Sequence, residues 1–309
     1  MTKKKRTDAA ILTLGPVLFN WPVEKWRDFY FRIADEAPVD TVVVGETVCE
    51  KRLPFFAPHF PDVIERLQRG GKEVVFATLG LIANERERAA TRDAVNMDDL
   101  LIEANDITAV AELAGRPHAI GPMVNVYNEG TLEFLAGQGA CRVCLPPELP
   151  GKSVAALTLA AAIELEVQVF GRLPLAISTR CYHARSRNLS KDGCLYVCAE
   201  DPDGMIIETI DDEPFLAVNG TQTMSLSYVN LMRELQGLKA LGVRRFRLSP
   251  QDIDMVAVAT LFREALEGTE SVSMANVALA MLCEGTAFSN GFFHGHEGRI
   301  QVGRSSAVE

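Results

Sequence analysis

The chain has 309 residues, a formal net charge of −10 at pH 7 and a pI near 5.1. This acidic balance argues against broad binding to nucleic acid or to an anionic membrane surface. Neither a secretory signal nor a membrane span is evident, because the basic run Lys3 to Arg6 precedes little apolar sequence, and Glu164 and Glu166 interrupt the longest apolar stretch. We therefore expect a cytoplasmic protein.

Short β-rich runs alternate with helical stretches, which is the pattern of repeated βα units around a parallel sheet. We expect eight strands, at residues 10–14, 41–46, 73–79, 100–105, 119–126, 141–148, 167–178 and 245–250. Apolar spacing predicts helices at residues 23–37, 61–71, 85–95, 107–116, 129–139, 153–166, 228–242, 252–268 and 272–283. This order favours one (β/α)8 TIM-like barrel domain over residues 1–309, with an open parallel α/β sheet as the alternative.

The connection after the seventh predicted strand is unusually long. Between about residues 179 and 222 it carries three cysteines, the turn segments DPDG and DDEP, and the strand-like runs GMIIETI and PFLAVNG. Barrels of this type place reactive groups on loops at the C-terminal ends of their strands, and a long insertion there is a normal way to add a cofactor site. We expect a cofactor-binding insertion at residues 179–222.

Three of the seven cysteines, Cys181, Cys194 and Cys198, lie within this insertion. Without evident export they are expected to be reduced thiols or metal ligands, and soft sulfur ligands favour zinc, copper(I) and iron. A four-ligand site needs one more residue. Cys49 follows the second predicted strand as Cys181 follows the seventh, so a barrel places both on the same face. Geometry therefore favours Cys49 as the fourth ligand.

The other cysteines have simpler interpretations. Cys141 and Cys144 lie in one predicted strand, where alternation sends them to opposite faces, and we interpret both as small buried hydrophobic residues. Cys283 lies on the apolar side of a predicted helix. Cys194 and Cys198 are four residues apart and could share one buried helical face without metal, but their polar flanks, KDG and EDPDG, favour ligation.

Several polar residues are candidates by position alone. Glu46, Asn105, Asn125 and Glu148 lie near the ends of predicted strands two, four, five and six, where barrels carry site residues and open sheets carry ordinary helix caps. Arg180 precedes the first central cysteine and could offset the charge of a thiolate-ligated group.

The histidines and serines give weaker signals. His183 could donate to a ligand sulfur, but an exposed loop histidine is the simpler interpretation, and His294 and His296 are expected to be solvated loop residues. Ser225 and Ser227 have no evident His and Asp partners, and the chain lacks paired histidines at helical spacing, so a peptidase site is not indicated.

Three segments carry a family resemblance. GETVCEKR, the C-x12-C-x3-C spacing in STRCYHARSRNLSKDGCLYVC, and NGTQTMSLSYVNL together resemble the collagenase-like peptidase family of unassigned catalytic type, in its ubiquinone-biosynthesis branch. The similarity runs from the first predicted strand to about residue 260.

The resemblance implies a [4Fe-4S] cluster held by Cys49, Cys181, Cys194 and Cys198. It also implies a heterodimer with a UbiU-like protein and a role in oxygen-independent hydroxylation of a ubiquinone precursor, with prephenate as oxygen donor. Four thiolates would complete the iron coordination of such a cluster. A structural four-cysteine zinc scaffold and a peptidase stay open as alternatives.

Overall fold

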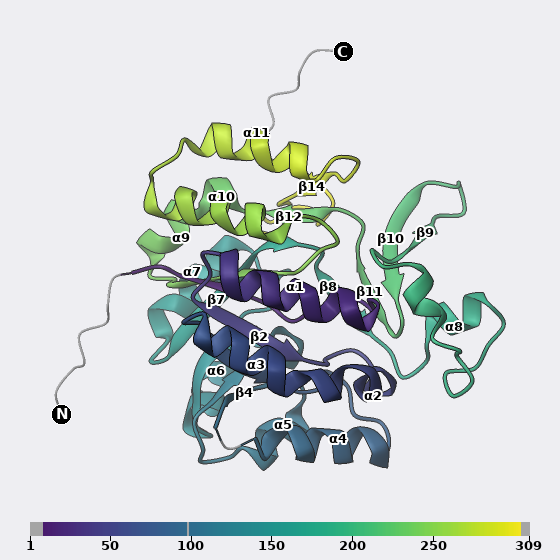
Figure 1. Ribbon diagram of the computed structural model, residues 1–309. Helices are drawn as coiled ribbons and strands as arrows, with labels where there is room; N and C mark the ends of the chain where they lie inside the picture. The colour runs from purple at the N-terminus through teal and green to yellow at the C-terminus, as the bar shows by residue number, and fades with distance from the viewer. Residues whose placement is uncertain (1–8, 98, 304–309) are drawn as a thin grey trace.

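The computed structural model describes residues 9–97 and 99–303. Within this part, eight parallel strands form a closed barrel (Figure 1). They are β1 (Ile11–Leu14), β2 (Thr41–Gly45), β3 (Glu73–Ala77), β4 (Leu101–Ala104), β5 (His118–Ile120), β6 (Ala140–Cys144), β7 (Glu164–Gly171) and β13 (Arg245–Leu248). Because β13 pairs in parallel with both β7 and β1, the ring has no open edge at this point. The (β/α)8 prediction is confirmed, and the open-sheet alternative is wrong.

Helices surround the barrel and cover the outer faces of its strands. The longer ones are α1 (Val23–Glu36), α3 (Phe60–Arg69), α4 (Glu85–Val95), α5 (Ile107–Glu112), α6 (Glu129–Gly137), α7 (Gly151–Ala160), α9 (Leu235–Leu241), α10 (Met255–Glu267) and α11 (Val272–Leu282). Local signals set their starts: Asn84 and Glu87 form a capping box at α4, and the Asp254 side chain accepts two backbone N–H bonds at α10. Among the described residues, no helix is long and apolar enough to cross a lipid bilayer.

Two predicted boundaries around the seventh strand are wrong. The helix expected at residues 153–166 ends at Ala160, and β7 begins at Glu164 because its charged and apolar residues alternate with the period of a strand. The strand expected at residues 167–178 breaks at Gly171, whose φ of +99° suits glycine, and resumes as β8 (Pro174–Ile177).

The helix expected at residues 228–242 is also shorter than predicted. Its first residues form β12 (Tyr228–Asn230), which pairs with β7 and with β14 (Phe288–Ser289), and a 3-10 turn (Met232–Glu234) precedes α9. This segment returns the chain from the insertion to the side of the barrel.

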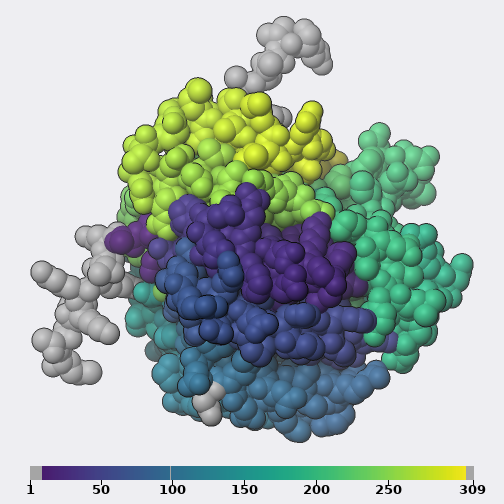
Figure 2. Space-filling model, in the orientation of Figure 1, coloured from purple at the N-terminus to yellow at the C-terminus, as the bar shows by residue number. Residues whose placement is uncertain are grey.

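A four-stranded antiparallel sheet forms the insertion. Its order is β8-β11-β10-β9, with β9 (Met205–Glu208), β10 (Pro214–Asn219) and β11 (Gln222–Ser225). The expected strand-like runs are β9 and β10. The short helix α8 (Tyr182–Ser186) and a 3-10 turn (Val197–Glu200) lie between β8 and β9. We call residues 174–225 the cysteine lobe; it projects from one side of the barrel body (Figure 2).

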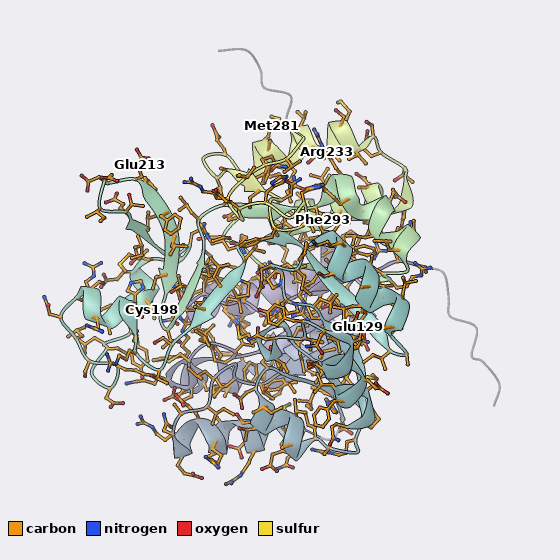
Figure 3. All side chains as sticks on the ribbon, turned by 180° about the vertical axis from the view of Figure 1, so that it is seen from behind. Glu129, Cys198, Glu213, Arg233, Met281 and Phe293 are labelled. Atoms are coloured by element: carbon orange, nitrogen blue, oxygen red, sulfur yellow. The ribbon has the colours of Figure 1, made fainter. Side chains whose placement is uncertain are left out.

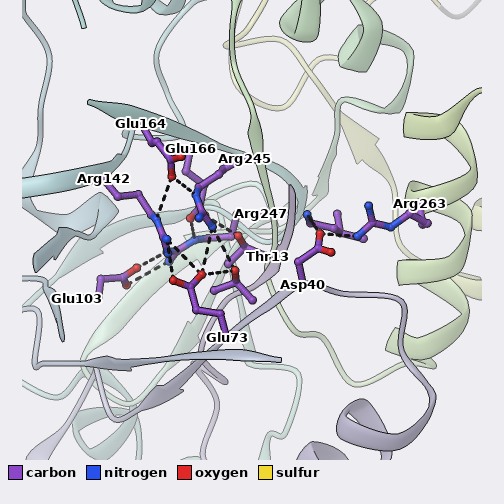
Figure 4. A network of polar contacts seen from close by, with 12 residues as sticks. Thr13, Asp40, Glu73, Glu103, Arg142, Glu164, Glu166, Arg245, Arg247 and Arg263 are labelled. Carbon is purple, nitrogen blue, oxygen red and sulfur yellow. Dashed lines mark hydrogen bonds and ion pairs between the residues drawn. The ribbon is translucent and has the colours of Figure 1, made fainter. Parts of the chain in front are cut away.

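The barrel interior holds buried charges instead of the usual apolar layers. Side chains of β3, β4, β6, β7 and β13 form two groups of ion pairs (Figure 4). Buried Arg247 pairs with buried Glu103 and Glu166, and Arg142 and Arg245 pair with Glu73 and Glu164, whose side chains are partly exposed. Burial alone would raise the pKa of Glu166, but the neighbouring Arg247 guanidinium and the Thr13 hydroxyl lower it below its ordinary value. Glu166 therefore stays ionised inside the barrel.

Removing one member of these ion pairs should be costly. In Arg247→Met, Glu103 and Glu166 lose their shared cation while buried, so we expect the free energy of unfolding to fall by about 3–5 kcal/mol, measured by urea denaturation. The control is Arg66→Met, which breaks an exposed pair with Asp35 and should leave the unfolding midpoint nearly unchanged. Similar midpoints for both variants would contradict a stabilising interior network.

Candidate metal centre

The cysteine lobe meets the loop after β2 at a pocket lined by four cysteines. They are Cys49 from that loop and Cys181, Cys194 and Cys198 from the lobe. Figure 3 marks the position of Cys198 in the lobe. Cys181 and Cys198 are buried, whereas Cys49 and Cys194 are partly exposed. The fold thus gathers into one pocket the four residues singled out from the sequence.

The segment between Cys194 and Cys198 has a strained backbone. Leu195 and Tyr196 have φ values of +49° and +56°, which bulky residues rarely adopt. The two residues turn the chain so that both cysteines line the pocket, and a 3-10 turn begins only at Val197. The alternative in which both cysteines share one helical face is therefore wrong.

Two of the sulfurs accept hydrogen bonds from nitrogen donors. The backbone N–H of Ala184, in the first turn of α8, lies 3.4 Å from Cys181 Sγ, and the Asn20 side-chain Nδ2 lies 3.3 Å from Cys198 Sγ. Donors aimed at sulfur favour the thiolate over the thiol and tune the thiolates of a cluster. These donors fit a site whose sulfurs carry negative charge.

Burial has the opposite effect, because it raises the pKa of these thiols and so disfavours the thiolate. It raises the pKa of Cys49 to about 12, with Arg52 lowering that pKa in part, and it also raises the pKa of Cys181. A buried thiol that must ionise needs a positive partner, which a bound metal supplies. The donor set of four cysteines therefore fits a thiolate-bound metal group.

A buried arginine links three segments beside the pocket. Arg52 Nη1 donates to the Leu18 carbonyl at 3.0 Å, and its Nη2 donates to the Asn219 side-chain oxygen at 2.6 Å. Gly220 follows with a φ of +71°, and a Cβ there would lie 2.6 Å from Arg52 Nη2. Only glycine lets the turn between β10 and β11 approach this guanidinium so closely.

Asn219 connects that arginine to the cysteine segment. Its side-chain oxygen also accepts the Asn20 backbone N–H, and its Nδ2 donates to the carbonyls of Cys198 and Asp201, at 2.9 Å each. Asn219 is fully buried, and both ends of its amide have partners. The position of Cys198 is thus fixed by hydrogen bonds from Asn20 and Asn219, in two other segments of the chain.

Sequence reasoning assigned no role to Asn20, Arg52 or Asn219. Arg52 and Asn219 lie within GETVCEKR and NGTQTMSLSYVNL, so the signal was present in the segments that carry the resemblance. The expected counter-charge, Arg180, is exposed, and Arg52 is the buried cation that lines the pocket. No local pattern in the chain distinguishes the arginine that becomes buried from the one that stays exposed.

The four polar residues expected near strand ends, Glu46, Asn105, Asn125 and Glu148, have different surroundings. Glu46 shapes the cysteine loop, because its carboxylate accepts the backbone N–H groups of Val48 and Cys49 at 2.7 and 3.1 Å; its own pKa is raised by burial. Asn105 lies buried at the barrel mouth, where its Nδ2 donates to the carbonyl of Thr78 and to Glu103. Neither side chain lines the cysteine pocket.

Asn125 and Glu148 are not at a site with the cysteines. β5 ends at Ile120, and Asn125 is an exposed turn residue with φ +62°, so its expected place at a strand end is wrong. Glu148 accepts a hydrogen bond from the Tyr127 hydroxyl.

The expected exposure of His183 and the expected burial of Cys141 are also wrong. His183 is fully buried in α8, with Nε2 2.9 Å from the Asp201 carboxylate, because α8 packs against the β10–β11 turn. Cys141 is exposed on the outer face of β6, whereas Cys144 and Cys283 are buried as expected. His294 is exposed and contacts Glu234, and His296 is exposed as expected.

Comparison with known proteins places the chain in a family. Residues 24–303 match the model of peptidase family U32. The chain belongs to this family. The resemblance to collagenase-like peptidases is therefore confirmed at the level of the family.

Two solved structures are similar at low identity. One is dihydropteroate synthase from Thermus thermophilus, with 15% identity, 85% of this chain and 94% of that chain covered, and a TM-score of 0.42. The other is a truncated 3-deoxy-D-arabino-heptulosonate 7-phosphate synthase from Thermotoga maritima, with 12% identity, 92% and 90% coverage, and a TM-score of 0.39.

Ser225 and Ser227 do not form a serine-peptidase site with the residues that the structure describes. The Ser225 hydroxyl donates to the Ser227 carbonyl, and the Ser227 hydroxyl donates to Ser289 at 2.8 Å. In the part of the chain that the structure describes, neither hydroxyl contacts a histidine. These serines join β11 and β12 to the barrel side.

A substitution of the buried Arg52 tests whether this side chain holds the three segments beside the pocket together. Arg52→Gln should lower the free energy of unfolding by about 3 kcal/mol, because carbonyl and amide oxygens lose their charged donor while staying buried. Arg180→Gln is the matched control: its side chain is exposed, and we expect an unchanged urea midpoint. An equal loss in both variants would show that Arg52 does not hold the three segments together.

Proposed function

We propose that the chain is a counterpart of UbiV, a [4Fe-4S]-binding subunit of an oxygen-independent hydroxylation system in ubiquinone biosynthesis. One observation carries the proposal: four cysteines from segments more than a hundred residues apart line a single pocket. Membership of family U32 and the three matching segments support it.

The cluster would be held by Cys49, Cys181, Cys194 and Cys198. When bound, it would supply a redox centre or a structural cross-link, since four thiolates leave its irons without an open position. Asn20 and the Ala184 N–H would donate to its sulfur ligands, and Arg52 would balance part of its charge.

The spacing of the cysteines bears on the choice of metal. One zinc ion bound by four thiolates, at Zn–S distances near 2.3 Å, draws the sulfurs to about 3.8 Å from one another. Among the described residues, no three His, Cys, Asp or Glu side chains converge as a site for a single ion. A cubane holds its four thiolates farther apart around a larger core. Iron, sulfide and zinc analysis of the purified protein decides between the two.

The wider role rests on the resemblance. Hydroxylation without dioxygen requires another oxygen donor, for which we propose prephenate, and the ring of a ubiquinone precursor as acceptor. A UbiU-like protein would complete the enzyme as a heterodimer in the cytoplasm. Peptidase activity is not part of this proposal, since Ser225 and Ser227 bond to structural neighbours.

The cluster is tested by purification without oxygen. We expect visible absorption and close to equal iron and sulfide, lost in Cys49→Ala as fully as in Cys194→Ala, because both line one pocket. Cys141→Ala and Cys144→Ala are matched controls outside it and should keep the colour. A folded, colourless, iron-free wild type would refute the proposal, and one zinc without iron would support the zinc scaffold.

The partner is tested by co-expression with a UbiU-like protein. We expect one heterodimeric species in size-exclusion chromatography, with the cluster absorption in the same peak. Elution of this chain as a lone monomer, with its cluster intact, would count against the heterodimer and leave the cluster assignment standing.

A further inference from the structure

An open hollow adjoins the cysteine pocket on the lobe. It has a volume of about 310 Å3 and is lined by Thr179, Arg180, Cys181, Arg185, Ser190 and Lys191; we call it the arginine groove. Cys181 and Lys191 also line the cysteine pocket, so the two share a wall. Its volume is in the range of sites for small molecules.

A second hollow extends this space toward the start of α4. Its volume is about 380 Å3, and it shares Thr179 and Lys191 with the arginine groove. The charges here are mutually paired: Arg86 contacts Asp192 at 3.0 Å, and Lys191 contacts Glu87 at 2.8 Å. Lys191 also lies 3.9 Å from Glu50, and Glu85 is a further carboxylate that lines this hollow. This second hollow has no excess of positive charge.

The arginine groove differs because two of its cations have no counter-charge. The guanidinium groups of Arg180 and Arg185 make no hydrogen bond or ion pair with any residue that the structure describes, and no carboxylate lines the groove. The nearby Arg187, in contrast, pairs with Glu200 at 3.0 Å. In a chain of net charge −10, two unpaired guanidinium groups in one hollow are an exception.

We propose that the arginine groove binds a small carboxylate-bearing molecule beside the metal centre. Guanidinium groups present planar, paired N–H donors that match a carboxylate, and the hydroxyls of Thr179 and Ser190 supply further donors. The inference rests on the proposed function, in which an organic molecule supplies the oxygen atom. We assign the binding site of that oxygen donor to the arginine groove, which lies on the other side of Cys181 from the cysteine pocket.

The competing explanation is that Arg180 and Arg185 only balance the charge of the cluster. The two explanations differ in what the cations bind. A purely electrostatic role predicts a changed reduction potential in Arg180→Gln/Arg185→Gln and no ligand that depends on these residues. A binding role predicts a small anion whose affinity falls in the same variant.

The experiment measures malonate binding by calorimetry to anaerobically purified, cluster-loaded protein. We expect malonate to bind more tightly than acetate, and its affinity to fall about tenfold or more in Arg180→Gln/Arg185→Gln, because the variant loses both guanidinium donors. Arg187→Gln is the matched control and should bind malonate as the wild type does.

Three results would overturn the proposal. They are equal malonate affinity in the double variant, no measurable binding to the wild type, and inorganic phosphate binding as tightly as malonate. Absorption and iron content, read on the same samples, keep the two proposals apart. A protein without cluster that still binds malonate through Arg180 and Arg185 would refute the cluster and support the groove, and a loaded protein without malonate binding would do the reverse.

Discussion

The architecture of the four-cysteine pocket depends on one buried charge, the guanidinium of Arg52. It lies between the loop after β1 and the turn between β10 and β11, where it is bonded to Leu18 and Asn219. Its own loop carries Cys49, and Asn219 in turn holds the backbone at Cys198. A buried cation without such partners would be strongly unfavourable, so the three loops must meet for the charge to be tolerated. The same contacts bring the cysteines together.

The hydrogen bonds of Arg52 and Asn219 also explain how the strained backbone at Leu195 and Tyr196 persists. Leu195 and Tyr196 are in the left-handed region, and such residues persist only when their surroundings define their conformation. Asn219 fixes the backbone just beyond them, and the Tyr196 ring packs edge-on against Phe55 from the cysteine loop, with centroids 4.8 Å apart. Strain in the lobe is thus balanced by contacts with the barrel.

The sequence was enough to predict the barrel and the four cysteines, because strand order and the position of a residue after a strand follow from local patterns. It was not enough for the side chains between them. Whether Arg52 or Arg180 would be buried depends on how the lobe packs against the β2 loop, which no local pattern records. The start of β7 is hard to predict for a related reason: Glu164 and Glu166 resemble a helical surface until Arg245 and Arg247 on the neighbouring strand are known to pair with them.

The ion pairs inside the barrel have a further consequence for the cysteine lobe. The two groups of ion pairs join strands β3, β6, β7 and β13 and strands β4, β7 and β13, and they include no residue of the lobe, so the barrel has its own source of cohesion. The four-cysteine pocket lies outside this body, where the lobe meets the loop after β2. Changes confined to the cysteine pocket therefore leave these ion pairs in place, so the barrel and the lobe draw their stability from separate sets of contacts.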